Sequence, residues 1–450
     1  MNKLSENGEL LDQLGEVEQR YRAHHPLSAK RHETACSHFP GGSTRSAIFY
    51  TPFPLTWVRG LGNRLVDLDG LDYADFLGEY SAALYGHSNP TIQAAISKVV
   101  EDGMALGGPN VYEAQLAAAI RERFPSMELL RFTNSGTEAN LMALSTVRAL
   151  EPSKKRLMVF NGAYHGGVFY FRSGQASLNI PFDWVVASYN AVEPTRALLR
   201  EHAAHLAGVI VEPMLGGGCL AGTPEFLGML REECSAHHIP LIFDEVMTSR
   251  LSPSGAQGLL GIVPDLTTMG KYLGGGASFG AFGGRRDILS RFDPGHPHAF
   301  EHAGTFNNNI ISMAAGLAGL TKVFTPAAAH QLNALGDSLR SSLNTMADRL
   351  AIPFKATGMG SLIGLHFAHA DSDVGAEKTS MVQLQALFHL ALIERGFYFG
   401  RRGYVALSMP TTSEDCAAFA AAVEDFLVSH RRLIHRTVHA DEPGIASGET

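Results

Sequence analysis

The sequence predicts an α/β protein with a mainly parallel seven-stranded sheet and a smaller α+β domain. Two observations lead to this prediction. Between residues 64 and about 325, short apolar segments alternate with helical patterns, and such alternation is typical of a parallel sheet covered on both faces. From residue 326 onward the pattern changes to a long helix, two or three strands and further helices.

In the large domain, each predicted strand is a short apolar run bounded by turn signals. We expect these strands at 129–133, 156–160, 184–187, 208–211, 241–243, 266–269 and 279–283. Apolar residues at helical spacing predict helices between several of them, at 136–150 and 224–237. In the smaller domain we expect strands near residues 354, 364 and 404.

The N-terminal part differs from the alternating region. Residues 9–30 carry Leu and Val at helical spacing and predict an exposed amphipathic helix, whereas residues 39–60, rich in Gly, Pro and aromatic residues, predict an extended arm. Asp69-Gly70 predicts the turn of a hairpin. We therefore expect an N-terminal helix and arm (1–63, part of the smaller domain), a large domain (64–325), a C-terminal part of the smaller domain (326–433) and a polar tail (434–450).

Composition narrows the classes of function. The chain has 450 residues, of which 45% are apolar and 18% charged, as in an ordinary globular enzyme, and its net charge of −8 argues against nucleic acid or an anionic membrane as a partner. Four cysteines without CxxC spacing indicate a reducing compartment. The polar N-terminus shows no signal peptide and no apolar run is long enough for a bilayer, so we expect a cytoplasmic protein.

Asp244 and Lys271 are the most informative residues of the chain. Each ends one of two successive apolar segments, and they lie 27 positions apart. The cofactor pyridoxal phosphate (PLP) needs a lysine amine for its Schiff base and an acid beside its pyridinium nitrogen. Two surface charges at strand ends are the alternative interpretation. The neighbouring motifs favour the cofactor.

Ser135, Gly136 and Thr137 follow the predicted strand 129–133 and open the predicted helix 136–150. Backbone N–H groups at a helix N-terminus, with two hydroxyl groups beside them, form an anion site suited to a phosphate. The alternative is an ordinary helix cap, with Glu138 satisfying the first turn. Because ligands of open α/β folds bind at the carboxyl ends of the strands, the first interpretation is favoured.

Three further residues follow predicted strands or precede a helix. Tyr164 offers an aromatic ring that either stacks on a flat pyridine or belongs to the core or surface. The Glu212 carboxylate either joins the cofactor's hydrogen-bond network or caps the next loop. Thr305, in a Gly-Thr-Phe-Asn loop, offers a hydroxyl to a phosphate. P-loop spacing fails at Asp265 and Tyr272, and the absence of HExxH argues against zinc, so no metal is expected.

Together these segments resemble the class III, fold type I, PLP-dependent aminotransferases, over about residues 36–430. The resemblance rests on motifs in the family's order: Ser135-Gly136-Thr137-Glu138-Ala139, Tyr164-His165-Gly166, Phe243-Asp244-Glu245-Val246, Gly270-Lys271 and Gly304-Thr305-Phe306. It implies that Lys271 binds the cofactor covalently, Asp244 pairs with the ring nitrogen, Tyr164 stacks on the ring and Val246 packs behind it. It also implies that Ser135, Gly136 and Thr137 hold the phosphate, and that Thr305 reaches the phosphate of the other subunit in an obligate homodimer.

Within this family the chain resembles the β-amino-acid aminotransferases more than the glutamate-1-semialdehyde 2,1-aminomutases. Arg45 matches an arginine that receives the substrate carboxylate in β-phenylalanine aminotransferases, and Arg402 matches that group's C-terminal arginine. A transaminase binds an amino acid and a keto acid such as 2-oxoglutarate or pyruvate in one site, and two guanidinium groups suit that task. Solvated surface charges are the alternative. Arg401, where the group tends to have proline, departs from the pattern.

Several apolar residues are expected to line a pocket for the substrate side chain, although core packing explains them equally well: Phe49, Tyr50, Phe53, Tyr80 and Met214. The resemblance therefore implies transamination of a β-phenylalanine-like amino acid. An aminomutase acting within one molecule is the alternative, and a non-catalytic PLP-binding protein is the third possibility.

Overall fold

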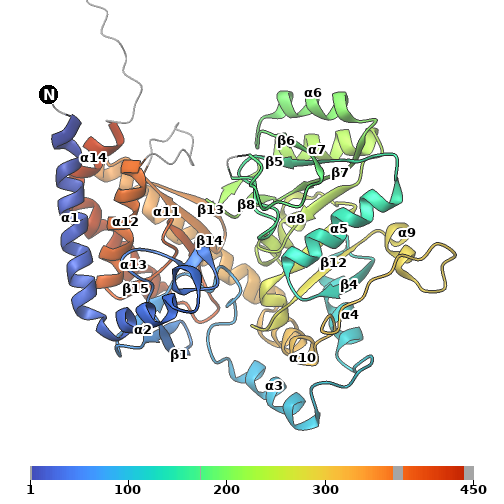
Figure 1. The fold of residues 1–450 in the computed structure, drawn as a ribbon, viewed down its shortest axis with the longest axis horizontal. Helices are drawn as coiled ribbons and strands as arrows, with labels where there is room; N and C mark the ends of the chain where they lie inside the picture. Colours follow the sequence, from blue (N-terminus) through green and yellow to red (C-terminus); the bar gives the residue numbers. More distant parts are fainter. Residues whose placement is uncertain (1–2, 173, 368–378, 440–450) are drawn as a thin grey trace, which may run out of the picture. The chain divides into compact units, whose positions relative to one another are not determined.

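The structure is a computed structural model that describes residues 3–172, 174–367 and 379–439. The chain folds into two compact units (Figure 1). Unit 1 comprises residues 1–80, 335–358 and 362–450, and unit 2 comprises residues 81–334 and 359–361. Each unit has its own sheet or sheets.

Unit 2 is built on a seven-stranded sheet with the strand order β4-β12-β11-β10-β7-β5-β6. β12 is antiparallel to both β4 and β11, whereas β11, β10, β7, β5 and β6 pair in parallel. This confirms the mainly parallel seven-stranded sheet. The strands are β4 (Leu129–Thr133), β5 (Arg156–Phe160), β6 (Asp183–Ala187), β7 (Leu206–Val211), β10 (Leu241–Asp244), β11 (Leu266–Gly270) and β12 (Gly280–Gly284).

Helices cover both faces of this sheet, as β5 illustrates. Leu157 and Val159 pack in the cluster that includes α5 (Gly136–Leu150), whereas Met158 and Phe160 pack in the cluster that includes α6 (Val192–His202) and α7 (Pro224–Ala236). Successive side chains of a strand point to opposite faces, so nearly continuous apolar runs are needed here. Figure 1 shows α5 on one side of these strands and α6 and α7 on the other.

The remaining elements of unit 2 surround the sheet. The helix α10 packs against α3 and α4, while β8 and β9 form a short antiparallel hairpin after β7. These elements are α3 (Pro90–Asp102), α4 (Glu113–Arg123), β8 (Met214–Leu215), β9 (Leu220–Ala221), α8 (Gly255–Leu260), α9 (Arg286–Leu289) and α10 (Ile310–Ala318). Among the described ranges, no single helix is long and apolar enough to cross a membrane; one pair, Ile310–Val323 with Pro326–Leu350, passes that test only jointly, across a 77° bend.

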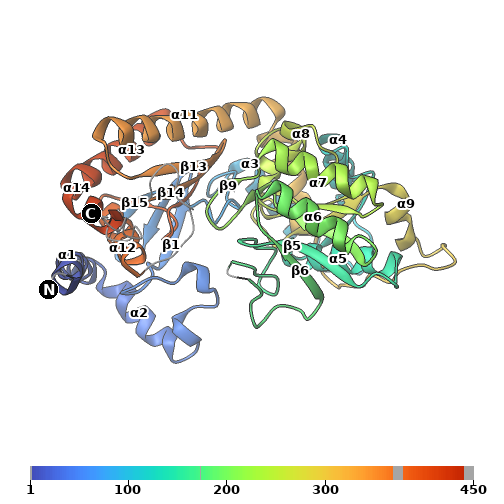
Figure 2. The same ribbon diagram turned by 90° about the horizontal axis from the view of Figure 1, so that it is seen from above.

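Unit 1 contains a four-stranded sheet, β1-β2-β3-β15, and a three-stranded sheet, β13-β14-β16. Figure 2 shows α11 lying over β13 and β14, and within unit 1 Asn344 of α11 exchanges two hydrogen bonds with Ala356 of β13 (2.9 and 2.8 Å). Its strands are β1 (Trp57–Leu61), β2 (Arg64–Asp67), β3 (Asp72–Asp75), β13 (Lys355–Met359), β14 (Leu362–His366), β15 (Phe397–Tyr398) and β16 (Tyr404–Ala406). Its helices are α1 (Lys3–His24), α2 (Pro26–Cys36), α11 (Pro326–Leu350, which begins in unit 2), α12 (Thr379–Glu394), α13 (Ser413–Ser429) and α14 (Arg431–His439).

Two sequence-based expectations for unit 1 need correction. The single helix expected at 9–30 is two helices, because Pro26 lacks a backbone N–H and starts α2 at its first position. The first helix is also not simply exposed, since Leu10 and Val17 are buried. Residues 431–439 form α14, so a helix covers the start of the segment expected as a polar tail (434–450), and residues 440–450 lie outside the described ranges.

Candidate active site

The N-terminus of α5 forms an anion site at the carboxyl end of β4. Ser135 is the N-cap of the helix, and its Oγ accepts a hydrogen bond from the backbone N–H of Glu138 at 3.1 Å. The first N–H groups of a helix have no partner within the helix and mark the positive end of its dipole. Ser135, Gly136 and Thr137 thus offer hydroxyl and backbone donors of the kind that a phosphate accepts.

Glycines let distant segments approach this helix terminus. A Cβ on Gly136 would lie 2.7 Å from Val246 Cγ2, and one on Gly270 would lie 3.2 Å from Val246 Cγ1. A Cβ on Gly166 would lie 2.3 Å from Thr137 Oγ1. Any side chain at Gly136 or Gly166 would force these neighbours apart. The glycines therefore bring together the four segments that the sequence predicted to form one site.

Asp244 lies buried at the end of β10, held by three N–H donors. Its Oδ2 accepts hydrogen bonds from His165 Nδ1 and Asn140 Nδ2, both at 2.8 Å, and its Oδ1 accepts one from the Val246 backbone at 3.0 Å. Asn140 is oriented in turn, because its Oδ1 accepts a hydrogen bond from Thr268 Oγ1 at 2.6 Å. A carboxylate has about four lone-pair positions, so one remains for a further donor.

Neither His165, which lies within a quoted motif, nor Asn140, which directly follows one, was predicted to have a role. Asn140 did carry a signal, because it is a polar residue on the buried face of α5, beside Ala139, Ala143 and Leu144. His165 carried no comparable signal, because it lies in a loop and not on an apolar face of a helix or strand. In the structure His165 is buried, and its Nε2 has no hydrogen-bond partner within the described residues.

Lys271 follows β11, the parallel neighbour of β10. Asp244 is opposite Thr268 in this pair, so the carboxylate and the lysine leave the same edge of the sheet. The Lys271 backbone has φ = +56°, in the left-handed region. For a residue with a Cβ, that conformation costs about 1–2 kcal/mol, and such strain concentrates at functional sites.

Glu212 is buried after β7 and fixes the loop that carries Tyr164. Its carboxylate oxygens accept hydrogen bonds from the backbone N–H groups of Tyr164 and Gly216, each at 2.9 Å. Burial raises the pKa of Glu212; the charge of His165 opposes this rise, and the charge of Asp244 adds to it. The Tyr164 ring itself is 49% exposed, so it is accessible to a ligand.

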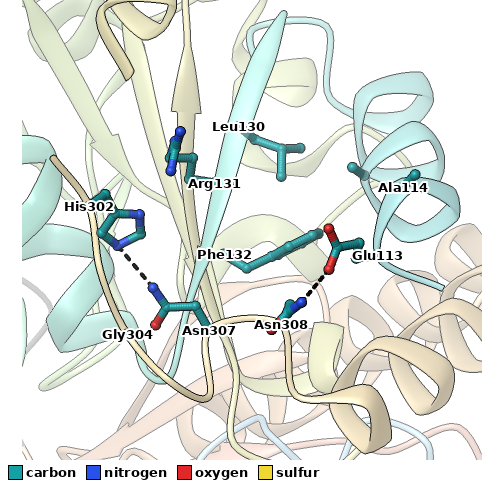
Figure 3. A pocket seen from close by; sticks show the side chains of 10 residues that line it. Glu113, Ala114, Leu130, Arg131, Phe132, His302, Gly304, Asn307 and Asn308 are labelled. Atoms are coloured by element: carbon teal, nitrogen blue, oxygen red, sulfur yellow. Dashed lines mark hydrogen bonds between the residues drawn. The ribbon is translucent and has the colours of Figure 1, made fainter. Parts of the chain in front are cut away.

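Thr305 lies exposed in the segment 304–309, which precedes α10. A cavity of about 480 Å³ lies between this segment, α4 and β4 (Figure 3). Charged and polar side chains line it, among them Glu113, Arg131, His302 and Asn307. Thr305 is not among the lining residues.

Unit 1 brings together three predicted substrate-binding residues. The Tyr80 hydroxyl donates to the backbone oxygen of Ala47 at 2.6 Å, in the arm that follows Arg45, and Arg45 pairs with Glu79. Burial raises the pKa of Tyr80, whereas the charges of Arg45 and Arg402 oppose that rise. The charge of Arg401 opposes the rise as well, and Arg402 itself is exposed.

The apolar residues expected to line a pocket differ in position. Tyr50 and Phe53 are buried in unit 1, where the Tyr21 hydroxyl donates to the Phe53 backbone oxygen at 2.9 Å, so they belong to its core. Met214 is completely buried in the β8–β9 hairpin. Phe49 is partly exposed, and its backbone oxygen accepts a hydrogen bond from Arg401 Nη1 at 3.3 Å. Arg401 thus ties its loop to the arm that carries Arg45.

Comparison with known proteins agrees with this geometry. Residues 46–426 match the family model for class III aminotransferases. The chain is 45% identical over 428 residues to the β-phenylalanine transaminase of Variovorax paradoxus, covering 94% of this chain and 98% of that protein. The crystal structure of a β-phenylalanine aminotransferase from the same organism superposes with a TM-score of 0.92 at 44% identity, covering 94% of this chain and 99% of that one.

Two further similarities are more distant. The glutamate-1-semialdehyde 2,1-aminomutase of Anaeromyxobacter dehalogenans is 34% identical over 419 residues, covering 88% of this chain and 96% of that protein. A transaminase solved with PLP bound has a TM-score of 0.83 at 31% identity, covering 92% of this chain and 99% of that one.

The fold and the site define an enzyme of the PLP-dependent transferase type. The chain belongs to the class III aminotransferase family. Its cofactor is PLP, which this family uses, and its substrates are an amino acid and a keto acid.

The residues of unit 2 fit that cofactor on three counts. The α5 terminus supplies donors for a phosphate, and Val246 leaves no room for a side chain on Gly136 and little room for one on Gly270. The buried Asp244 keeps one acceptor position for a cationic ring nitrogen. Lys271 supplies the amine that the family's chemistry requires, from the same edge of the sheet.

Proposed function

We propose that this enzyme transfers the amino group of a β-amino acid similar to β-phenylalanine to a keto acid such as 2-oxoglutarate or pyruvate. The observation that carries this proposal is the position of Arg45 in unit 1, where it pairs with Glu79 and lies in the arm to which the Tyr80 hydroxyl donates a hydrogen bond. The charge of Arg402 also opposes the rise that burial causes in the pKa of Tyr80. A transaminase binds two different acids in turn, and a guanidinium group binds a carboxylate bidentately. The 45% identity to a β-phenylalanine transaminase supports the choice of donor.

The two arginines have separate tasks in this proposal. Arg45 lies in the arm and pairs with Glu79, so the carboxylate of the β-amino acid displaces Glu79 from it. Arg402 is exposed and receives the carboxylate of the keto acid. Tyr80 contacts the segments that carry both arginines. Its hydroxyl donates to the arm that carries Arg45, and its ring stacks on that of Tyr404, two residues after Arg402, with 5.6 Å between the ring centroids.

The proposed cofactor-binding residues belong to unit 2. The terminus of α5 holds the phosphate, Glu212 fixes the backbone of the residue that stacks on the ring, and a valine packs behind the ring. Bound PLP supplies an electron sink for the electron pair released when a substrate C–H bond breaks. The residues assigned to these tasks are Ser135, Gly136, Thr137, Tyr164, Glu212 and Val246.

Asp244 and Lys271 carry the chemistry. Asp244, oriented by His165 and Asn140, keeps the ring nitrogen protonated, which strengthens the electron sink. Lys271 would hold the cofactor covalently, and its amine would take the proton from the substrate carbon that bears nitrogen and return one later. In a β-amino acid that carbon is Cβ.

The enzyme is proposed to act as a homodimer in which Thr305 reaches the cofactor phosphate of the partner. The exposure of nearby apolar side chains supports this assembly: Met104 (54%), Leu106 (59%), Val111 (69%) and Phe306 (62%). Their two segments are joined by hydrogen bonds from Asn308 to Gly108 (3.2 Å) and from Asn110 to Asn308 (2.9 Å). Apolar residues exposed together in this way mark an interface.

The test is an assay with β-phenylalanine and 2-oxoglutarate, in which the enzyme releases glutamate. Arg402→Ala raises KM for the keto acid more than for the amino donor, and Arg45→Ala does the reverse. Equal losses for both substrates in both variants would refute the division of tasks. Lys271→Ala is the inactive control, and it also loses the visible absorbance of the covalently bound cofactor.

The alternative is an aminomutase, which the 34% identical relative represents. An aminomutase moves nitrogen within one molecule and needs no second carboxylate site. Turnover of glutamate-1-semialdehyde with no release of glutamate from the β-amino acid assay would favour it. The second arginine argues against this alternative.

A further inference from the structure

The segment 304–309 is tied to the phosphate-binding end of α5 by one side chain. Asn307 Oδ1 accepts a hydrogen bond from Asn134 Nδ2 at 3.0 Å. Asn134 directly precedes Ser135, and its backbone N–H and its Nδ2 both donate to Glu138 Oε2, at 2.7 and 3.2 Å. The amide of Asn307 is therefore bonded to the residue that leads into the helix terminus.

The nitrogen of the same amide binds a residue just before the segment. Asn307 Nδ2 lies 3.2 Å from His302 Nε2 (Figure 3), and the Asn307 backbone N–H donates to Gly304 O at 3.2 Å. A Cβ on Gly304 would lie 2.3 Å from Asn307 Oδ1, so a glycine is needed there. Burial lowers the pKa of His302 and the charge of Arg131 lowers it further, so the neutral ring can accept the Asn307 hydrogen bond.

Asn308 anchors the segment independently, on the opposite side. Its Nδ2 donates to Glu113 Oε2 at 2.5 Å, as Figure 3 shows, and to Gly108 O at 3.2 Å. These bonds lead to α4 and to the segment before it, not to α5. Asn308 is therefore a matched control for Asn307: it is an adjacent residue of the same type, with as many hydrogen bonds.

We propose that Asn307 is a positioning residue that serves two active sites at once, fixing the phosphate-binding terminus of its own subunit and aligning Thr305 for the partner's site. This inference rests on the proposed function, in which Thr305 reaches the cofactor phosphate of the partner. Thr305 lies between His302 and Asn307, and the Asn307 side chain joins these two residues and also binds Asn134. An exposed hydroxyl on such a short segment is aligned only if both of its ends are fixed.

The first experiment compares cofactor release from three holoenzymes: wild type, Asn307→Leu and Asn308→Leu. We expect Asn307→Leu to release PLP about tenfold faster, as the loss of one well-formed hydrogen bond predicts, measured as decay of the bound-cofactor absorbance in the presence of a trapping reagent. Asn308→Leu removes an anchor that does not reach α5, so it should raise the release rate by a clearly smaller factor than Asn307→Leu does. Equal rates for the two variants would overturn the assignment to Asn307.

The second experiment asks whether one Asn307 acts on both sites. Mixed dimers are prepared in which one subunit carries Lys271→Ala, so that a single site holds the cofactor covalently. Asn307→Leu is then placed either on the subunit that keeps Lys271 or on the subunit that lacks it. We expect faster release in both arrangements than in the mixed dimer without Asn307→Leu. If only the first arrangement releases faster, Asn307 acts on its own subunit alone and the inference is wrong.

Two controls separate this inference from the proposed function. Sedimentation of each variant at assay concentration reports the assembly, and a monomeric wild type would refute the proposed homodimer together with this inference. His302→Phe removes the ring nitrogen that accepts from Asn307 and keeps the bond from Asn134 to Asn307, so it covers the case in which Asn307→Leu fails to fold. A normal release rate in His302→Phe, in both mixed dimers, would show that alignment of Thr305 does not need the His302 bond and would overturn the proposal.

Discussion

The left-handed backbone of Lys271 predicts that glycine stabilises the protein at this position. Lys271→Ala and Lys271→Gly both remove the amine, so they differ only in the Cβ. At φ = +56° a Cβ costs about 1–2 kcal/mol, which the glycine variant avoids. Glycine also gives the unfolded chain more conformational freedom, which lowers the free energy of unfolding by about 0.5–1 kcal/mol relative to alanine. We therefore expect Lys271→Gly to be more stable than Lys271→Ala by about 0.5–1 kcal/mol.

The measurement is urea unfolding of the two cofactor-free proteins, because bound cofactor would add its own binding free energy to the folded state. Lys98 provides a control pair, since it is exposed within α3 and its backbone is helical. There Lys98→Gly should be less stable than Lys98→Ala by about 1 kcal/mol. If the glycine variant is also the weaker one at Lys271, the backbone there is not strained and the reasoning fails.

Three further predictions follow from buried contacts. Asn140→Leu removes a bond to Asp244 and should lower the free energy of unfolding by about 2 kcal/mol in urea; an unchanged midpoint would contradict this. Gly136→Ala collides with Val246 and should cost about 1–3 kcal/mol, and added Val246→Ala should recover part of this loss. Burial lowers the pKa of His389 in the folded protein from 6.5 to about 3. As the pH falls, His389 is therefore protonated in the unfolded chain before it is protonated in the folded protein. Stability should therefore decrease below pH 6.5 by up to about 1.4 kcal/mol per unit, and His389→Gln should flatten this slope; identical slopes would exclude His389 as the cause.

The elements of unit 2 could be predicted because their signals are local. The expected strands 129–133 and 156–160 and the helix 136–150 have the observed bounds, since apolar runs and a Ser-Gly start mark them directly. The convergence of Asp244 and Lys271 on one edge was also predictable, because parallel strands end together there. Their individual roles stay predictions.

Tertiary contacts explain what the sequence did not reveal. His165 lies 79 positions from Asp244, and Asn140 lies 128 positions from Thr268, so no local pattern announces either hydrogen bond. The two-residue strand β15 exists only through its parallel pairing with β3. In α14 the arginines and histidines obscured a helix whose other face buries Leu433, Ile434 and Val438.

The division of labour between the units has a consequence for how such enzymes diversify. Arg45, Tyr80 and Arg402 belong to unit 1, whereas Asp244 and Lys271 belong to unit 2. Under the roles proposed above, exchanges in the first group retarget the enzyme toward new acids while the residues proposed to bind vitamin B6 stay unchanged. A laboratory library aimed at altered selectivity is best confined to the arm and the loop before β16.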